Sequence, residues 1–166
     1  METFTQILAS FGGMLWMTVT FPIYTLYILW RNNWKVLHSI SDSYYMLKRK
    51  EQHEEILFTL FTFFLGIGLI LQYPHSFFFF PAGMGLFWVG TQTQFRGESI
   101  KGTIHYAGAV IAILLSLIGL LTQGVWIPLV ICGIGTIIMD YLKINNFIWW
   151  VEMLAFLTII GGLWIL

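Results

Sequence analysis

The chain has 166 residues, of which 58% are hydrophobic and only 10% are charged, and its mean hydropathy is +0.79. Because a water-soluble domain carries about 25% charged residues, this composition excludes an ordinary soluble globule and favours a protein embedded in a membrane. The net charge is zero, so nothing predicts nucleic acid as a partner.

Apolar segments follow one another along the chain, each close to the roughly 20 residues that an α-helix needs to cross the hydrocarbon core. We expect membrane-spanning helices near residues 11–30, 56–71, 77–91, 104–121, 125–139 and 147–166. The sequence therefore predicts an all-α fold in which residues 1–166 form a single domain, a polytopic integral membrane bundle of about six helices.

The first span is followed by the long polar stretch "VLHSISDSYYMLKRKEQHEE", residues 36–55. From Trp34 to Leu47 its apolar residues recur at helix-like intervals, which predicts an amphipathic helix lying in the membrane interface. His38 and Asp42 would then share one face, because they are four residues apart. The alternative is a surface helix whose polar side simply faces water.

The basic residues predict the orientation of the bundle. All eight lie in the loops after the first, third and fifth spans: Arg31, Lys35, Lys48, Arg49, Lys50, Arg96, Lys101 and Lys143. The positive-inside rule places these loops in the cytoplasm and both termini outside.

Three ionisable residues are candidates for catalysis. Glu152 lies inside the last span, His105 opens the fourth span beside small residues, and Asp42 lies in the first loop. A charged group in a membrane span is costly, so each should face the bundle interior and find a partner. All three approach the same membrane face in the predicted topology, so we expect a polar cavity there, in which they perform acid–base work on a lipid headgroup.

Other polar residues near this face are candidates for ligand binding: His38, Ser41, Tyr45, Gln94, Glu98, Tyr106 and Asp140. The chain has no HxxxH, HExxH or CxxC motif, so we predict no metal site and the cofactor stays undefined. Structural roles remain open as alternatives: His105 as a helix-end histidine bonded to a carbonyl, and Glu152 as an interfacial residue beside the Trp149–Trp150 pair.

Two short elements carry a resemblance to a known group. Ile40, Ser41 and Asp42 in the first loop, and His105 followed by Gly108 and Ala109 in the fourth span, resemble elements of the Frag/DRAM/Sfk-like six-span membrane proteins and their uncharacterised bacterial relatives. Some members of that group are implicated in lipid remodelling or lipid distribution. The resemblance therefore implies lipid handling and points to Asp42 and His105.

Three functions follow as hypotheses, and whether the chain is an enzyme stays open. The first is a membrane protein whose one-sided polar cavity binds or processes a lipid or other amphiphile, with membrane lipids as its partners. The second is an accessory subunit of a larger membrane complex, whose partner subunits or second copy would contact apolar faces such as Phe77–Phe80. The third is a small oligomeric transporter or channel that uses Glu152.

Overall fold

The computed structural model describes residues 4–49, 54–92 and 99–166. Within these ranges the chain forms helices and no strand, which confirms the predicted all-α class. The helices are α1 (Phe4–Arg31), α2 (Ser43–Lys48), α3 (Ile56–Ile70), α4 (Phe79–Thr91), α5 (Ser99–Thr122), α6 (Ile127–Tyr141) and α7 (Phe147–Leu163). Two segments, Phe4–Arg31 and Ile100–Thr122, are long and apolar enough to cross a membrane, and α3, α4, α6 and α7 are shorter apolar helices.

Six of these helices lie over the segments expected from the sequence, but α1 begins much earlier, at Phe4 rather than near residue 11. The early start has a physical reason in Ser10. Its hydroxyl donates a hydrogen bond of 2.7 Å to Oε1 of Gln72, so this polar residue lies buried inside the bundle instead of ahead of it.

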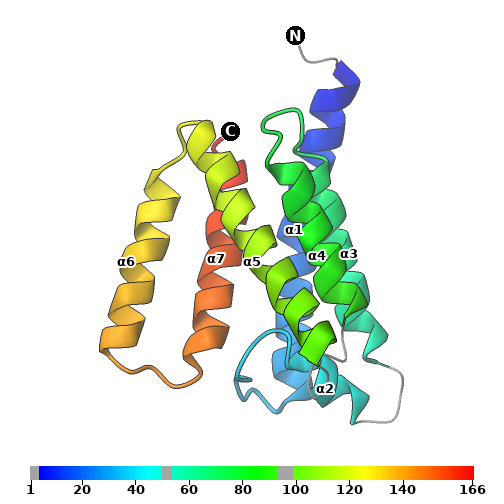
Figure 1. Ribbon diagram of the computed structural model, residues 1–166, viewed down its shortest axis with the longest axis vertical. Coiled ribbons are helices and arrows are strands. Elements are labelled where there is room, and N and C mark those ends of the chain that lie inside the picture. The colour runs from blue at the N-terminus through cyan, green and yellow to red at the C-terminus, as the bar shows by residue number, and fades with distance from the viewer. Residues whose placement is uncertain (1–3, 50–53, 93–98) are drawn as a thin grey trace.

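The helices run up and down the bundle (Figure 1). α4 packs against both α3 and α5, while α1 packs against α3 and α7. α6 packs against α7 at the edge of the bundle, and none of its residues is buried. The α6–α7 turn, α2 and the beginning of α5 lie at one end of the bundle.

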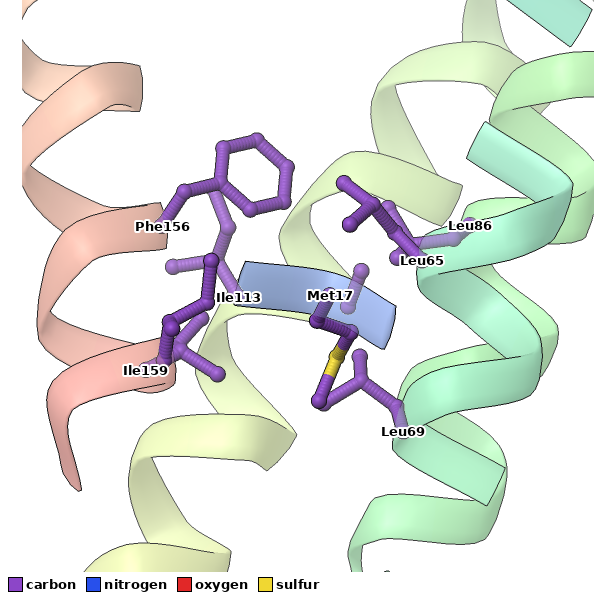
Figure 2. A pocket seen from close by; sticks show the side chains of 9 residues that line it. Met17, Leu65, Leu69, Leu86, Ile113, Phe156 and Ile159 are labelled. Atoms are coloured by element: carbon purple, nitrogen blue, oxygen red, sulfur yellow. The ribbon is translucent and has the colours of Figure 1, made fainter. Parts of the chain in front are cut away.

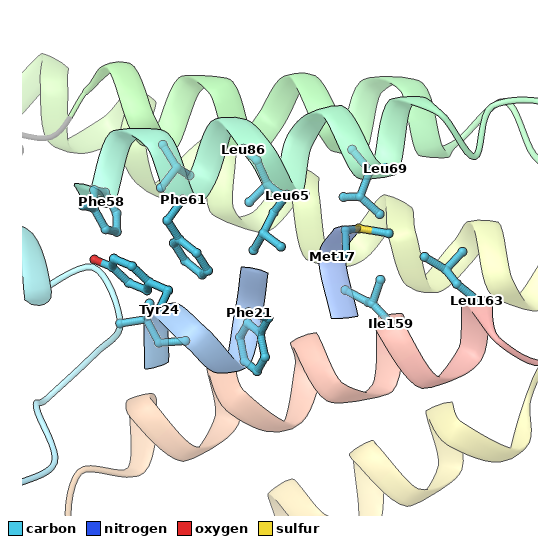
Figure 3. Packing of buried hydrophobic residues seen from close by; sticks show 14 of the residues in the cluster. Met17, Phe21, Tyr24, Phe58, Phe61, Leu65, Leu69, Leu86, Ile159 and Leu163 are labelled. Atoms are coloured by element: carbon cyan, nitrogen blue, oxygen red, sulfur yellow. The ribbon is translucent and has the colours of Figure 1, made fainter. Parts of the chain in front are cut away.

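The central core is apolar and connects α1, α3, α4, α5 and α7 (Figure 3). Met17, Phe21 and Leu65 are almost fully buried there. Tyr24 stacks on Phe61, with ring centroids 4.0 Å apart. This core fixes the relative positions of the helix ends that carry the polar residues.

Glycine brings α4 and α5 into backbone contact. A Cβ added to Gly85 would lie 2.6 Å from the carbonyl oxygen of Gly108, and one added to Gly108 would lie 2.7 Å from that of Gly85. Only residues without a side chain permit this approach. The first half of α5 is consequently held tightly against the middle of α4.

The predicted amphipathic helix at residues 34–47 is wrong over most of its length, because only Ser43–Lys48 is helical. Asn33 and Trp34 have φ angles of 54° and 61°, and the left-handed turn at these residues ends α1. The backbone that follows also forms hydrogen bonds with α7. The carbonyl of His38 accepts a hydrogen bond of 3.0 Å from the N–H of Trp149, and the N–H of Ile40 donates to Glu152.

Candidate functional site

A cavity of about 110 Å³ lies at the end of the bundle where α2 and the α6–α7 turn are found. Three segments form it: the loop before α2, the first turns of α5 and the first turns of α7. The lining residues are His38, Ser39, Ser41, Asp42, His105, Tyr106, Ala109, Ile148 and Glu152.

His105 is the most buried ionisable residue of the cavity, with 1% of its surface exposed. Its Nε2 lies 3.0 Å from Oγ of Ser41, within hydrogen-bonding distance. The ring stacks beside Phe58 at a centroid distance of 6.5 Å, and it also interacts with the backbone of Val89 and Gln92 at the end of α4. The imidazole is therefore held on several sides with one nitrogen directed at the Ser41 hydroxyl.

Glu152 connects α7 to the loop. Its Oε2 accepts a hydrogen bond of 2.5 Å from the N–H of Ile40, the residue before Ser41. Asp42, just before α2, lines the cavity close enough for its carboxylate to interact electrostatically with that of Glu152. The Asp42 N–H donates to the carbonyl and hydroxyl oxygens of Ser39, both at 3.2 Å. The loop conformation thus depends on α7.

The structure places the three residues predicted to be catalytic, Asp42, His105 and Glu152, on this one cavity. Three of the predicted ligand-binding residues line it with them: His38, Ser41 and Tyr106. Their chemical roles stay predictions.

Two of the predicted ligand-binding residues lie elsewhere. Tyr45, on the short helix α2, packs edge-on against the Tyr44 ring at 5.2 Å and does not line the cavity. Asp140 pairs with Lys143 at 3.1 Å in a well-exposed ion pair at the end of α6, the outermost helix. Gln94 and Glu98 lie outside the described residues.

The polar cavity continues into apolar space toward the middle of the bundle. Ser41, Ala109 and Glu152 also line a second cavity of about 30 Å³, whose other walls are mostly apolar. A third cavity, of about 10 Å³, shares Leu86, Ile113 and Phe156 with the second (Figure 2). The interior thus changes from polar to apolar along one path.

A second buried polar group, near the other end of the bundle, was not anticipated from the sequence. Ser10 donates to Gln72, and its Oγ also lies 2.8 Å from Nε2 of His75. The Gln72 amide donates in turn to the backbone carbonyls of Ser10 and Gly68, at 2.9 and 3.1 Å. The sequence signal for this group is Gln72 and His75 in "LQYPHS", between the second and third predicted spans.

In the part of the chain that the structure describes, no group of three or more His, Cys, Asp or Glu side chains is arranged to hold a metal ion. No family model, curated protein or solved structure matches the chain. The functional argument therefore rests on the cavity and its surroundings.

Proposed function

We propose that this protein is an integral membrane protein whose cavity binds the polar headgroup of a lipid or other amphiphile. The observation that carries the proposal is the order of the cavities. Polar groups surround the outer space of about 110 Å³, and apolar side chains surround the spaces behind it. An amphiphile has the same order of a polar head followed by an apolar chain.

The chemistry of the lining favours a headgroup that donates hydrogen bonds. Asp42 and Glu152 supply carboxylate oxygens, and His38, Ser41 and Tyr106 add further polar atoms. An ammonium or hydroxyl headgroup would satisfy these acceptors, while a bare phosphate would meet two negative charges. The contact between Ser41 and His105 adds support, because it joins the two elements that resemble lipid-handling proteins.

The proposed topology has six membrane-crossing helices, α1 and α3 to α7, with the cavity at the cytoplasmic face. The basic residues that the structure describes at the cavity end of the bundle support its cytoplasmic location. They are Arg31, Lys35, Lys48, Arg49, Lys101 and Lys143. At 1.5 Å per residue, the 15 residues of α3 or α6 cover about 22 Å, so their end turns and local thinning of the bilayer would complete the crossing.

Lipid retention tests the binding proposal. The protein is purified in mild detergent, and its bound lipids are identified by native mass spectrometry and extraction. Asp42→Asn and Glu152→Gln remove one charge each, and the glutamine keeps an oxygen to accept the Ile40 N–H. We expect each to weaken binding about tenfold, since a charge-assisted hydrogen bond contributes about 1.5–3 kcal/mol.

Asp140→Asn is the matched control, because Asp140 is exposed at the end of α6 and should leave binding unchanged. Equal retention by all four proteins would overturn the proposal, as would a wild-type protein that carries no amphiphile.

An accessory subunit is the second candidate function, and the observation that favours it is α6. Ile131, Ile134 and Ile137 are 53–70% exposed on a helix with no buried residue. Lipid or a partner helix would cover this face. In a Cys132→Ala background, a cysteine introduced at Ile137 would form a cross-link with a partner chain in native membranes. If the protein with this cysteine stays monomeric, the accessory role is contradicted.

A further inference from the structure

We infer that Ser41 and His105 form a nucleophile–base pair that cleaves an acyl ester in the bound amphiphile. This inference rests on the proposed function, because the amphiphile supplies the ester. The chain would then be a serine-dependent lipid acyl hydrolase whose reaction takes place inside the helical bundle.

The geometry of the pair is the first support. Ser41 Oγ and His105 Nε2 are 3.0 Å apart, within the reach that a general base needs to take a hydroxyl proton. The imidazole interacts with the backbone of Val89 and Gln92 as well. Nε2 is the ring nitrogen that faces Ser41, so it can take the hydroxyl proton when the ring carries its own proton on Nδ1.

The position of Ser41 is the second support. Its side chain lines both the polar cavity and the apolar cavity behind it. In an acyl lipid the ester carbonyl lies between the headgroup and the hydrocarbon chain. A lipid bound with its head beside Asp42 and its chain beside Phe156 would therefore present that carbonyl to Ser41.

The reaction balances with water as the only co-reactant. Ser41 Oγ attacks the ester carbonyl carbon, and its proton passes to His105 Nε2. The bond from that carbon to the headgroup-side oxygen breaks, and His105 returns the proton to this oxygen. Water then attacks the acyl carbon of the acyl–serine ester while His105 Nε2 takes its proton. The bond from that carbon to Ser41 Oγ breaks, His105 returns the proton to Oγ, and a fatty acid leaves. Water enters past His38 and Tyr106, which are exposed at the cavity.

The loop contacts make Glu152 a positioning residue in this scheme. Its carboxylate accepts a hydrogen bond from the N–H of Ile40 and so fixes the backbone next to Ser41. Glu152→Ala should slow the labelling of Ser41 described below more than Glu152→Gln, which keeps an acceptor for the Ile40 N–H.

A second serine–histidine pair in the chain can be compared with Ser41 and His105. Ser10 Oγ lies 2.8 Å from His75 Nε2, but Ser10 is 2% exposed and donates its proton to Gln72 instead. This pair should be unreactive, although its serine–histidine distance is shorter than that of Ser41 and His105.

The experiment is covalent labelling of the intact protein in lipid nanodiscs with a fluorophosphonate that carries a long alkyl chain. Peptide mass spectrometry identifies the modified serine. We expect an adduct on Ser41, its loss in Ser41→Ala, and at least tenfold slower labelling in His105→Gln, whose amide can still bond the serine but cannot act as a base. Ser10→Ala and Ser116→Ala are the matched serine controls and should label normally.

The pH profile separates catalysis from structure. Labelling of the wild type should fall at acidic pH as His105 becomes protonated, and the small residual rate of His105→Gln should lose this dependence. Thermal unfolding of each variant verifies that it is folded. A wild type without an adduct on Ser41, or a folded His105→Gln that labels at the wild-type rate, would overturn the inference.

The outcome also separates the two proposals. Lipid that is retained by the wild type and lost in Asp42→Asn, without any labelling of Ser41, would leave the binding function standing and remove the hydrolase. Absence of both lipid and labelling would remove both.

Discussion

Buried hydroxyl groups in this bundle form hydrogen bonds with residues that are distant in the sequence. Tyr24 of α1 and Ser43 of α2 are both buried, and their oxygens are 2.6 Å apart. Burying a polar group without a hydrogen-bond partner costs free energy. Each of these two hydroxyl groups avoids that cost by bonding to the other. The bond anchors the beginning of α2, and with it the loop that carries Ser41 and Asp42.

Tyr24→Phe should therefore destabilise the protein by about 1–2 kcal/mol, since the Ser43 hydroxyl is left buried and unpaired. Ser43→Ala should cost a similar amount, and the double variant should cost less than the sum of the two. Thermal unfolding in detergent measures each change. Tyr141→Phe is the control, because Tyr141 is 82% exposed. Additive effects of the two substitutions would show that the bond contributes nothing.

The sequence predicted the site residues where electrostatics leaves little choice. A carboxylate or imidazole within apolar sequence must face the interior, and Glu152 and His105 do so. The bond between Ser41 and His105 could not be predicted, because it depends on an irregular loop. Asp140 lies away from the cavity because it belongs to α6, which packs only at the edge of the bundle.

At the scale of elements, helix existence was predictable, because long apolar runs bounded by polar turns leave few alternatives in a membrane. The loop was not predictable from its pattern. Ile40, Tyr44 and Leu47 recur as in a helix and are all buried. Tyr44 and Leu47 lie on α2, but Ile40 lies in the non-helical loop, where its N–H donates to Glu152 of α7. Tertiary hydrogen bonds here override a local helical periodicity.

The α4–α5 contact gives a prediction at this scale. Gly85→Ala should destabilise the protein by about 1–3 kcal/mol, because the new methyl group would meet the backbone at Gly108 and Ala112 rather than a movable side chain. Thermal unfolding measures the cost. Gly133→Ala on α6 is the matched control, since nothing lies within 4 Å of its added Cβ, and it should have little effect. Equal losses in the two variants would contradict the close contact.

At the scale of the whole molecule, the proposed topology predicts which ends face the same compartment. In a Cys132→Ala background, cysteine at Lys143 should react with a membrane-impermeant maleimide from the cytoplasmic side, and cysteine at Gln123 from the opposite side. Both positions are exposed, at opposite ends of α6. Labelling of both from one side would show that α6 does not cross the membrane.

The bond from Ile40 to Glu152 has a consequence for biogenesis. It joins residues 112 positions apart, so the cavity loop cannot take its final form until α7 has been synthesised and has packed against the loop. Every shorter nascent chain lacks one wall of the cavity. The polar residues that line it would thus come together only in the last stage of folding, when α7 is in place.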